Sequence, residues 1–453
     1  MKFKKVGAVS LGCSKNTVDT EILLGELVSL GFEVVPDPAE AEIIIINTCG
    51  FITSAKQDSI DTILAMAEYK KSGSCGLLVV SGCLSERYSE DLPPELPEVD
   101  IFWGVRDYPA LAKELFRLAG GESAVSGSSD RRLVNCCGAS RLISTPPWRA
   151  YLRIADGCDN RCTYCAIPLI RGGRVSVPME KLVEEAKALA EKGVTELTVI
   201  AQDTSAYGMD IYGRPMLKEL LAALSAIGGL RWIRVLYAYP NTITEELVDA
   251  IRDDPKICNY IDIPIQHITP RMLTAMNRHG SAEHIRKICA YIRENAPDFI
   301  LRTTVMLGFP GETEEDFREL EAFMAEQPFD RVGAFVYSPE DGTPAAEFPD
   351  RVDESVAEAR LDAIMRRQQT ISLELNKKRV GTVCTVLVES VTPGREGFTA
   401  VGRSYAECAD VDGVIRLRPE DPSVRIPSPG EYVAARIVKA HHYDLDAIIL
   451  KEE

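Results

Sequence analysis

The segment DGCDNRCTYCAIPLIRGGR, residues 156–174, places Cys158, Cys162 and Cys165 in a Cys-x3-Cys-x2-Cys pattern directly after a short apolar run. Three thiolates at this spacing can bind one soft metal centre, either zinc or an iron–sulfur cluster. Structural zinc usually has four protein ligands, yet no fourth Cys or His lies within about a dozen residues of the pattern. A four-iron cluster held by three cysteines leaves one iron open to another ligand. The pattern therefore favours an iron–sulfur site over a zinc knuckle or redox thiols.

This spacing, with Tyr164 before the last cysteine, resembles that of the radical S-adenosylmethionine (SAM) enzymes. The resemblance implies that Cys158, Cys162 and Cys165 hold a [4Fe-4S] cluster and that its open iron binds the amino and carboxylate groups of SAM. Tyr164 is then expected to contact the cofactor.

Length and composition are ordinary for a globular protein, and 453 residues suggest two to four domains. Thirteen cysteines without a secretory context favour reduced thiols and metal ligation over disulfides. The net charge of −17 argues against loose binding to DNA or RNA, whose phosphates require Lys and Arg. It suits a basic protein partner, and it also serves solubility.

The N-terminus superficially mimics a short lipoprotein signal, because basic residues 1–5 precede an apolar stretch that leads to Cys13. That stretch is at the lower limit of a signal core, and polar residues follow at once. We expect it to be the first β-strand. Apolar runs elsewhere fall short of the roughly 18 residues that a membrane span needs, so we expect a cytoplasmic protein with no membrane partner.

The first predicted domain, residues 1–145, is an α/β unit with a parallel sheet. Short runs of β-branched residues at 6–11, 43–46 and 77–80 are typical of strands buried on both faces. Helical patterns at 20–30 and 55–69 lie between these strands.

A cysteine follows each of these three strands: Cys13, Cys49 and Cys83. Because the carboxyl ends of parallel strands meet at one edge of a sheet, we expect the three thiols to converge. Three equivalent positions favour a second cluster site over three unrelated buried thiols.

The motifs SLGCSKNTVDTE (10–21), INTCGFI (46–52) and SGCLSERY (81–88) resemble the N-terminal domain of the methylthiotransferases. The resemblance implies that Cys13, Cys49 and Cys83 hold a second [4Fe-4S] cluster. The remaining cysteines match no ligand motif and are expected to be structural: Cys75, Cys136, Cys137, Cys258, Cys289, Cys384 and Cys408. No role is assigned to the adjacent Cys136 and Cys137, which lie in a Gly/Ser-rich linker.

The second predicted domain, residues 146–375, alternates strand and helix patterns. The strand candidates are 151–155, 197–201, 233–237, 260–265, 301–307 and 332–337. Helical patterns separate them at 179–192, 216–226, 244–253, 284–294 and 313–327. Six such repeats predict a partial, open (β/α)6 TIM-like barrel, whose chemistry belongs at the carboxyl ends of the strands.

Distinctive residues fall at those strand ends: Gln202, Asp203, Gln266, Gly308 and Gly311. By resemblance to radical SAM proteins, we expect all five to contact SAM, with the glycine turn approaching the adenine.

Simpler interpretations stay open for some neighbouring residues. The glycine turn is also typical of a strand-to-helix connection, with Thr313 as the N-cap and Asp316 completing a capping box. His267 is either part of the site or a strand-end histidine with satisfied hydrogen bonds. Arg171 and Arg174 either bind the substrate or offset cluster charge.

The third predicted domain, residues 376–453, contains about five short strands punctuated by Gly or Pro, which predict a small antiparallel β-barrel. GRSYAECADVDGVI (402–415) and HHYDLDAIIL (441–450) resemble the TRAM domain, an OB-like module. That resemblance implies a role in presenting a macromolecular substrate.

Essentially the whole chain thus resembles the radical SAM methylthiotransferases. LGCSKNTVDTE and DIPIQH (262–267) resemble the branch that modifies an aspartate of the twelfth protein of the small ribosomal subunit, a basic protein. The alternatives are a tRNA adenosine methylthiotransferase and, more remotely, a non-enzymatic metal-binding ribosome-assembly factor.

The family implies two uses of SAM. One methylates a sulfur associated with the cluster of Cys13, Cys49 and Cys83. A second SAM is cleaved by an electron that comes from a separate donor through the cluster of Cys158, Cys162 and Cys165. The resulting 5′-deoxyadenosyl radical removes hydrogen from the aspartate β-carbon, which then receives the methylthio group. A protein environment shifts the pKa of a side chain by about 3–5 units at most, which is too little for an acid or base to remove a proton from an unactivated carbon. No catalytic acid or base is therefore expected.

Overall fold

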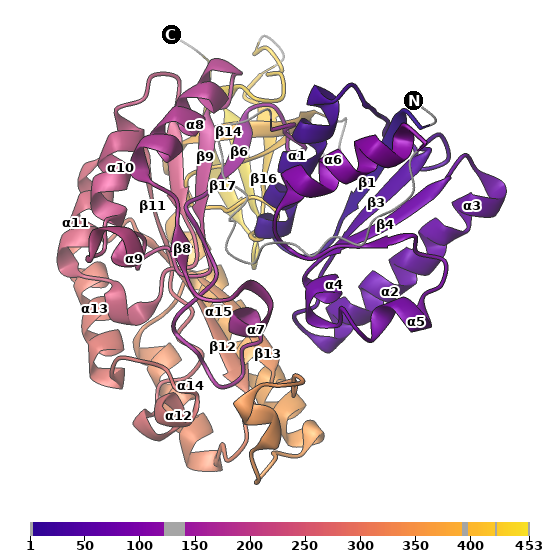
Figure 1. The fold of residues 1–453 in the computed structure, drawn as a ribbon. Helices are drawn as coiled ribbons and strands as arrows, with labels where there is room; N and C mark the ends of the chain where they lie inside the picture. Colours follow the sequence, from indigo (N-terminus) through magenta and orange to yellow (C-terminus); the bar gives the residue numbers. More distant parts are fainter. Residues whose placement is uncertain (1–2, 122–140, 392–396, 422–423, 452–453) are drawn as a thin grey trace. The chain divides into compact units, whose positions relative to one another are not determined.

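The computed structural model describes residues 3–121, 141–391, 397–421 and 424–451. Cys136 and Cys137 lie outside the described residues. The chain, drawn as a ribbon in Figure 1, forms two compact units. The first contains residues 1–229 and 338–347, and the second contains residues 230–337 and 348–453.

A five-stranded parallel sheet begins the first unit, with strand order β2-β1-β3-β4-β5. The strands are β1 (Lys5–Ser10), β2 (Glu33–Val34), β3 (Ile43–Thr48), β4 (Leu77–Gly82) and β5 (Ile101–Phe102). The three central strands are those predicted from the sequence. The edge strands β2 and β5 have two residues each, too few to produce a recognisable pattern.

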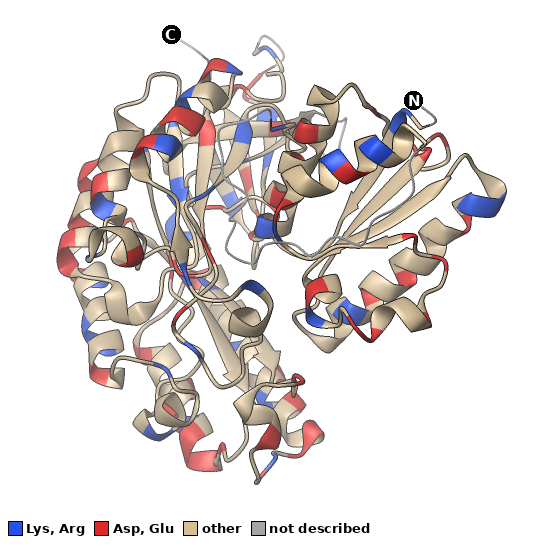
Figure 2. Ribbon diagram, viewed as in Figure 1, with Lys and Arg blue, Asp and Glu red and all other residues tan. Residues whose placement is uncertain are grey.

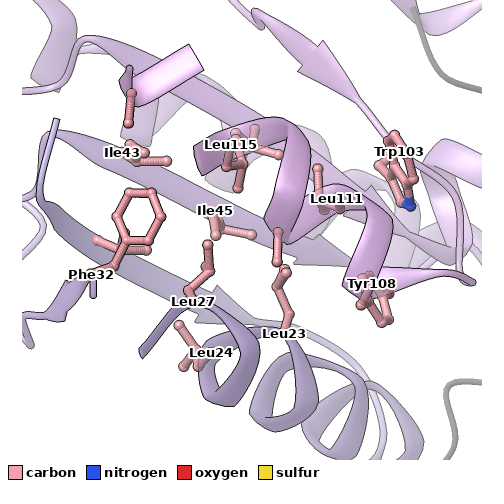
Figure 3. Packing of buried hydrophobic residues seen from close by; sticks show 14 residues of the cluster. Leu23, Leu24, Leu27, Phe32, Ile43, Ile45, Trp103, Tyr108, Leu111 and Leu115 are labelled. Atoms are coloured by element: carbon pink, nitrogen blue, oxygen red, sulfur yellow. The ribbon is translucent and has the colours of Figure 1, made fainter. Parts of the chain in front are cut away.

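Helices cover both faces of this sheet. They are α1 (Ser14–Ser29), α2 (Thr53–Ala67), α3 (Tyr69–Ser72), α4 (Cys83–Arg87), α5 (Leu92–Glu95) and α6 (Tyr108–Ala119). Alternate residues of β3 enter two separate cores, as the period of a strand requires. Ile43 and Ile45 pack with α1 and α6, as Figure 3 shows, whereas Ile44 and Ile46 pack with α2 and α4.

The rest of the first unit carries the cysteine loop. Strands β6 (Arg149–Arg153) and β9 (Glu196–Ile200) are parallel neighbours. Strand β7 (Ala155–Asp156) pairs antiparallel with β8 (Val175–Ser176), so the loop that holds Cys158, Cys162 and Cys165 is closed at its base. The accompanying helices are α7 (Ile167–Arg171), α8 (Met179–Glu191), α9 (Met209–Tyr212) and α10 (Leu217–Ser225). The 3-10 helix η2 (Pro344–Glu347) also belongs to this unit.

The second unit continues the β/α alternation. Strands β10 (Trp232–Val235), β11 (Ile257–Asp262), β12 (Ile300–Leu307) and β13 (Arg331–Val336) lie side by side and parallel. The helical segments are η1 (Pro240–Thr242), α11 (Glu245–Asp253), α12 (Pro270–Ala275), α13 (Ala282–Asn295) and α14 (Glu314–Glu326). With β6 and β9, these are the six strands that the sequence predicts. The capping box of Thr313 and Asp316 at α14 is also confirmed.

A long helix, α15 (Glu354–Lys378), leads to the C-terminal barrel. Its strands are β14 (Val383–Val391), β15 (Ala400–Arg403), β16 (Ile415–Pro419), β17 (Tyr432–Ala440) and β18 (Leu445–Ile449). They close in the order β14-β15-β16-β18-β17 around an apolar core.

The expectation of an antiparallel barrel needs one correction. Four strand pairs are antiparallel, but β16 and β18 are parallel. The reason is parity: directions cannot alternate all the way round a closed ring of five strands, so at least one pair must be parallel.

Lys and Arg residues are interspersed with Asp and Glu residues along the helices (Figure 2). Among the described residues, every helix is too short or too polar to cross a lipid bilayer.

Candidate metal centres

The carboxyl edge of the N-terminal sheet brings Cys13, Cys49 and Cys83 together. Cys13 is the N-cap of α1, Cys49 directly follows β3, and Cys83 is the first residue of α4. Cys13 is exposed, Cys49 is half-buried and Cys83 is buried. One side of this group therefore faces solvent while the other is enclosed.

Two glycines allow the turns that carry these cysteines to approach each other. Gly12 has φ +89°, and a Cβ there would lie 3.1 Å from Sγ of Cys49. Gly82 has φ +99°, and a Cβ there would lie 2.2 Å from Oδ1 of Asn47. Only glycine fits both the left-handed backbone and the close contact.

Asn16 ties the three turns together, a role that the sequence analysis did not identify. Its fully buried side chain donates from Nδ2 to the carbonyl of Leu11, at 2.9 Å, and to that of Thr48, at 3.0 Å. Its Oδ1 lies 3.6 Å from Sγ of Cys83. Asn16 thus contacts the residues before two cysteines and the thiol of the third.

Arg171, the last residue of α7, reaches the same thiol from the other cysteine loop. Its Nη2 lies 3.6 Å from Sγ of Cys83 and 2.9 Å from oxygens of Asn16 and Asp19. Its Nη1 donates to Asp156 at 3.1 Å. Arg171 is 1% exposed and lies beside Cys83, which favours an offset of cluster charge over contact with a substrate, and both roles stay predictions.

The electrostatics of this group favour a positively charged centre. Burial raises the pKa of the Cys83 thiol to about 12, against the opposing charge of Arg171. Negative charge on Cys13 or Cys49 raises that pKa further. Three thiolates here therefore repel one another unless a metal centre compensates their charge, which fits the predicted cluster.

The second group, Cys158, Cys162 and Cys165, lies on the loop closed by β7 and β8. The Cys158 amide donates to the carbonyl of Gly172 at 3.1 Å, and the Cys165 amide donates to that of Cys162 at 3.0 Å. Burial raises the pKa of Cys158 to about 11, whereas a backbone hydrogen bond and the charge of Arg174 lower it. This donor set also fits a soft, positively charged centre.

Neither cysteine group converges on a point. Within the part of the chain that the structure describes, no set of three His, Cys, Asp or Glu side chains is arranged to hold a single metal ion. Each cysteine of a four-iron cluster binds a different iron, so its ligands surround the core instead of meeting at one atom. The assignment of the six cysteines as cluster ligands stays a prediction.

Three predicted SAM contacts lie in the first unit. Gln202 donates to Asp156 at 3.0 Å, and its Oε1 is buried without a hydrogen bond, so this oxygen can accept from a ligand. Asp203 is buried and accepts from Asn160 at 2.8 Å, which links it to the cysteine loop. Tyr164 is half-buried beside Cys165.

The other three lie in the second unit. Gln266 has φ +66°, and its Oε1 is buried without a hydrogen bond. Gly308 has φ +71°, and a Cβ there would lie 2.4 Å from Cβ of Ala357 in α15. Gly311 has φ +80°. Packing and backbone conformation thus already require these glycines, and their contact with SAM stays a prediction.

His267 has hydrogen bonds at only one of its two ring nitrogens. It is fully buried, and its Nδ1 accepts from the amides of Ile268, at 2.9 Å, and Thr269, at 3.2 Å. These contacts hold the ring at Nδ1, whereas Nε2 is buried without a hydrogen bond, 3.4 Å from Oε1 of Glu312. Both interpretations of His267 therefore stay predictions.

Comparisons with known proteins agree with this architecture. Residues 152–324 match the radical SAM superfamily, residues 5–104 match the uncharacterized protein family UPF0004, and residues 380–449 match the TRAM domain.

The chain has full-length relatives. It is 47% identical over 448 residues to the ribosomal protein uS12 methylthiotransferase RimO of Clostridioides difficile (strain 630), covering 99% of each chain. It is 46% identical over 442 residues to the protein of the same name from Geobacter sulfurreducens, covering 98% of each chain.

Solved structures share the fold at low identity. The radical SAM methyltransferase TsrM from Kitasatospora setae has a TM-score of 0.56 at 14% identity, covering 85% of this chain and 81% of TsrM. The cobalamin-dependent radical enzyme OxsB has a TM-score of 0.52 at 12% identity, covering 82% of this chain and 56% of OxsB.

Proposed function

Because this chain belongs to the RimO family of ribosomal protein uS12 methylthiotransferases, with 46–47% identity over its whole length, we propose that it methylthiolates the β-carbon of an aspartate in uS12. The family is the one that the sequence motifs predict. The enzyme uses SAM and two [4Fe-4S] clusters, and it acts in the cytoplasm on a basic ribosomal protein.

The structural observation that supports this proposal is the placement of both cysteine groups in the first compact unit, where Arg171 from the loop of Cys158, Cys162 and Cys165 contacts Cys83 in α4. We assign Cys13, Cys49 and Cys83 to one cluster and Cys158, Cys162 and Cys165 to the other. When bound, the clusters supply the electron that cleaves SAM and the site that carries the transferred sulfur.

The protein itself positions reactants and excludes water. Cys83 and Cys162 are buried, so one side of each group is shielded from solvent. The free oxygens of Gln202 and Gln266 are available for the polar groups of SAM. We also assign residues 1–145, 146–375 and 376–453 to the methylthiotransferase N-terminal domain, the radical SAM core and the TRAM domain.

Mass spectrometry of uS12 and of tRNA from cells lacking this chain tests the proposal. The proposed function requires the methylthio group to disappear from the uS12 aspartate and to return when the intact gene is restored. Loss from tRNA adenosine, with uS12 unchanged, would show that the chain has the other activity of the methylthiotransferases.

Iron and acid-labile sulfide analysis separates the enzyme from a non-enzymatic assembly factor with structural zinc. Two clusters require about eight irons per chain. Zinc in their place would contradict the proposal.

A further inference from the structure

We propose that Arg171 is a positioning residue of the N-terminal cluster site, where its positive charge stabilises the reduced cluster at Cys83, although Arg171 belongs to the loop of the other three cysteines. This inference rests on the proposed function, since it requires a cluster at Cys13, Cys49 and Cys83. Arg171 thus acts on the group of Cys13, Cys49 and Cys83 from the loop that carries Cys158, Cys162 and Cys165.

The contacts of Arg171 fix its guanidinium against Cys83. Nη2 lies 3.6 Å from Sγ, and the same nitrogen is 2.9 Å from both Asn16 and Asp19. Nη1 is held by Asp156. A planar fork with fixed donors suits this arrangement, whereas a lysine ammonium cannot satisfy all four partners at once.

Arg174, three residues further on, provides an internal comparison. Its guanidinium lies 3.9 Å from Asp159 and 3.8 Å from Asp203, and its charge acts on Cys158. The loop therefore carries two arginines, the buried Arg171 beside Cys83 and the half-buried Arg174, whose charge acts on Cys158. Of the two roles that the sequence left open for these residues, this pairing favours an offset of cluster charge over substrate binding.

The physical effect follows from burial. Reduction adds a negative charge to a cluster that already carries thiolates, and a nearby positive charge favours that step. The interaction is strong because water is excluded and the effective dielectric constant is low. Asp19 and Asp156 hold the guanidinium in place, so its charge stays beside Cys83 when the cluster is reduced.

A purely structural role is the competing explanation. In that case Arg171 only joins Asp19 to Asp156, and its replacement changes stability without changing the properties of the cluster. The reduction potential and the magnetic coupling of the cluster distinguish the two roles, because neither depends on turnover.

The first experiment uses the full-length chain with Cys158, Cys162 and Cys165 replaced by Ala, so that only the N-terminal cluster assembles. In this background Arg171→Gln should destabilise the reduced cluster about tenfold, a shift of about 59 mV to more negative potential for one electron. Arg171→Lys, which keeps the charge, should recover more than half of that shift. Arg174→Gln is the matched control and should leave the potential unchanged.

The second experiment does not depend on the folding of Arg171→Gln, because its main measurement is made on the chain that retains Arg171. The same chain is labelled with guanidino-15N arginine, and the reduced N-terminal cluster is studied by pulsed electron paramagnetic resonance. Coupling to 15N should be present, should persist in Arg174→Gln and should disappear in Arg171→Lys, since the lysine nitrogen carries no label.

Two results overturn the inference: no 15N coupling to the reduced cluster, or an equal potential with Arg171 and with Gln at this position. A triple-alanine chain that binds no iron gives a different result, because it overturns the two-cluster function itself. The two failures are therefore distinguishable by iron content.

Discussion

The guanidinium of Arg171 lies 3.6 Å from the thiol of Cys83, although 88 residues separate the two in the chain. One residue belongs to the loop of Cys158, Cys162 and Cys165, and the other belongs to the N-terminal sheet. The environment of Cys83 is therefore built by both segments. Because Arg171 also donates to Asp156, a change in the loop of Cys158, Cys162 and Cys165 alters the surroundings of Cys83 directly.

The two cysteine groups should fail in different ways when a single ligand is removed. Cys158→Ala should abolish both SAM cleavage and methylthiolation, because cleavage requires the cluster proposed at Cys158, Cys162 and Cys165. Cys13→Ala should leave SAM cleavage and stop sulfur transfer. Chromatography of SAM products and mass spectrometry of uS12 measure the two steps separately. Methylthiolated product from Cys13→Ala would show that the division of labour is wrong.

Gly82→Ala should displace Cys83. The backbone at Gly82 is left-handed, and the added Cβ would meet Asn47 and the backbone of Thr48. We expect iron content to fall by about half, to about four per chain. Gly193→Ala is the control, because Gly193 has a similar φ of +98° with no atom within 4 Å of a Cβ. It should cost only the backbone strain of about 1–2 kcal/mol and keep the iron.

Asp19→Asn should destabilise the first unit strongly. The Asp19 carboxylate is fully buried and accepts from both Arg153 and Arg171. Removing its charge leaves two buried arginines without this partner, at a cost of about 3–5 kcal/mol. Asp362→Asn breaks an exposed pair with Arg366 and should cost less than about 1 kcal/mol. Urea unfolding measures both, and equal midpoints for the two variants would contradict this account.

The sequence predicts the elements of this fold well where the hydrophobic pattern is long. Each central strand of the N-terminal sheet is a run of apolar residues, and five of the six strands predicted in the central domain precede a helical pattern. The strands β2 and β5 escape prediction because two residues carry no period. The parallel pair of β16 and β18 is not predicted, because closure of the barrel, and not the local sequence, sets the direction of a strand pair.

The candidate site is predicted less completely. Cysteine spacing and strand ends identify six thiols, since both signals are local. Asn16 and Asp19 carry no such signal, because a buried polar residue in the first turns of a helix looks like an ordinary surface residue until its partners are known. Arg171 is visible in the sequence, but only the fold shows that it faces Cys83.

Glu407 should make the stability of the second unit depend on pH in the acid range. Burial alone would raise the pKa of Glu407, but the charges of Arg379 and Arg331 outweigh it and lower the pKa to about 2. Ser404 donates to the same carboxylate at 2.6 Å. A carboxyl group with a depressed pKa stabilises the fold above its unfolded pKa of about 4.3, and this stabilisation is lost as pH falls towards 2.

Glu407→Gln should therefore lower the free energy of unfolding at pH 7 by about 3–5 kcal/mol, because two arginines lose their buried partner. The difference between this variant and the parent chain should shrink as the pH is lowered from about 4.3 to 2, where the parent carboxyl becomes protonated. Glu431→Gln, at an exposed pair with Arg425 in the same barrel, is the control. This pair also lowers the pKa of Glu431, but solvent screens it, so the difference between the control variant and the parent chain should stay small at every pH. Urea unfolding at several pH values gives the answer, and a constant difference across that range would exclude Glu407 as the titrating group.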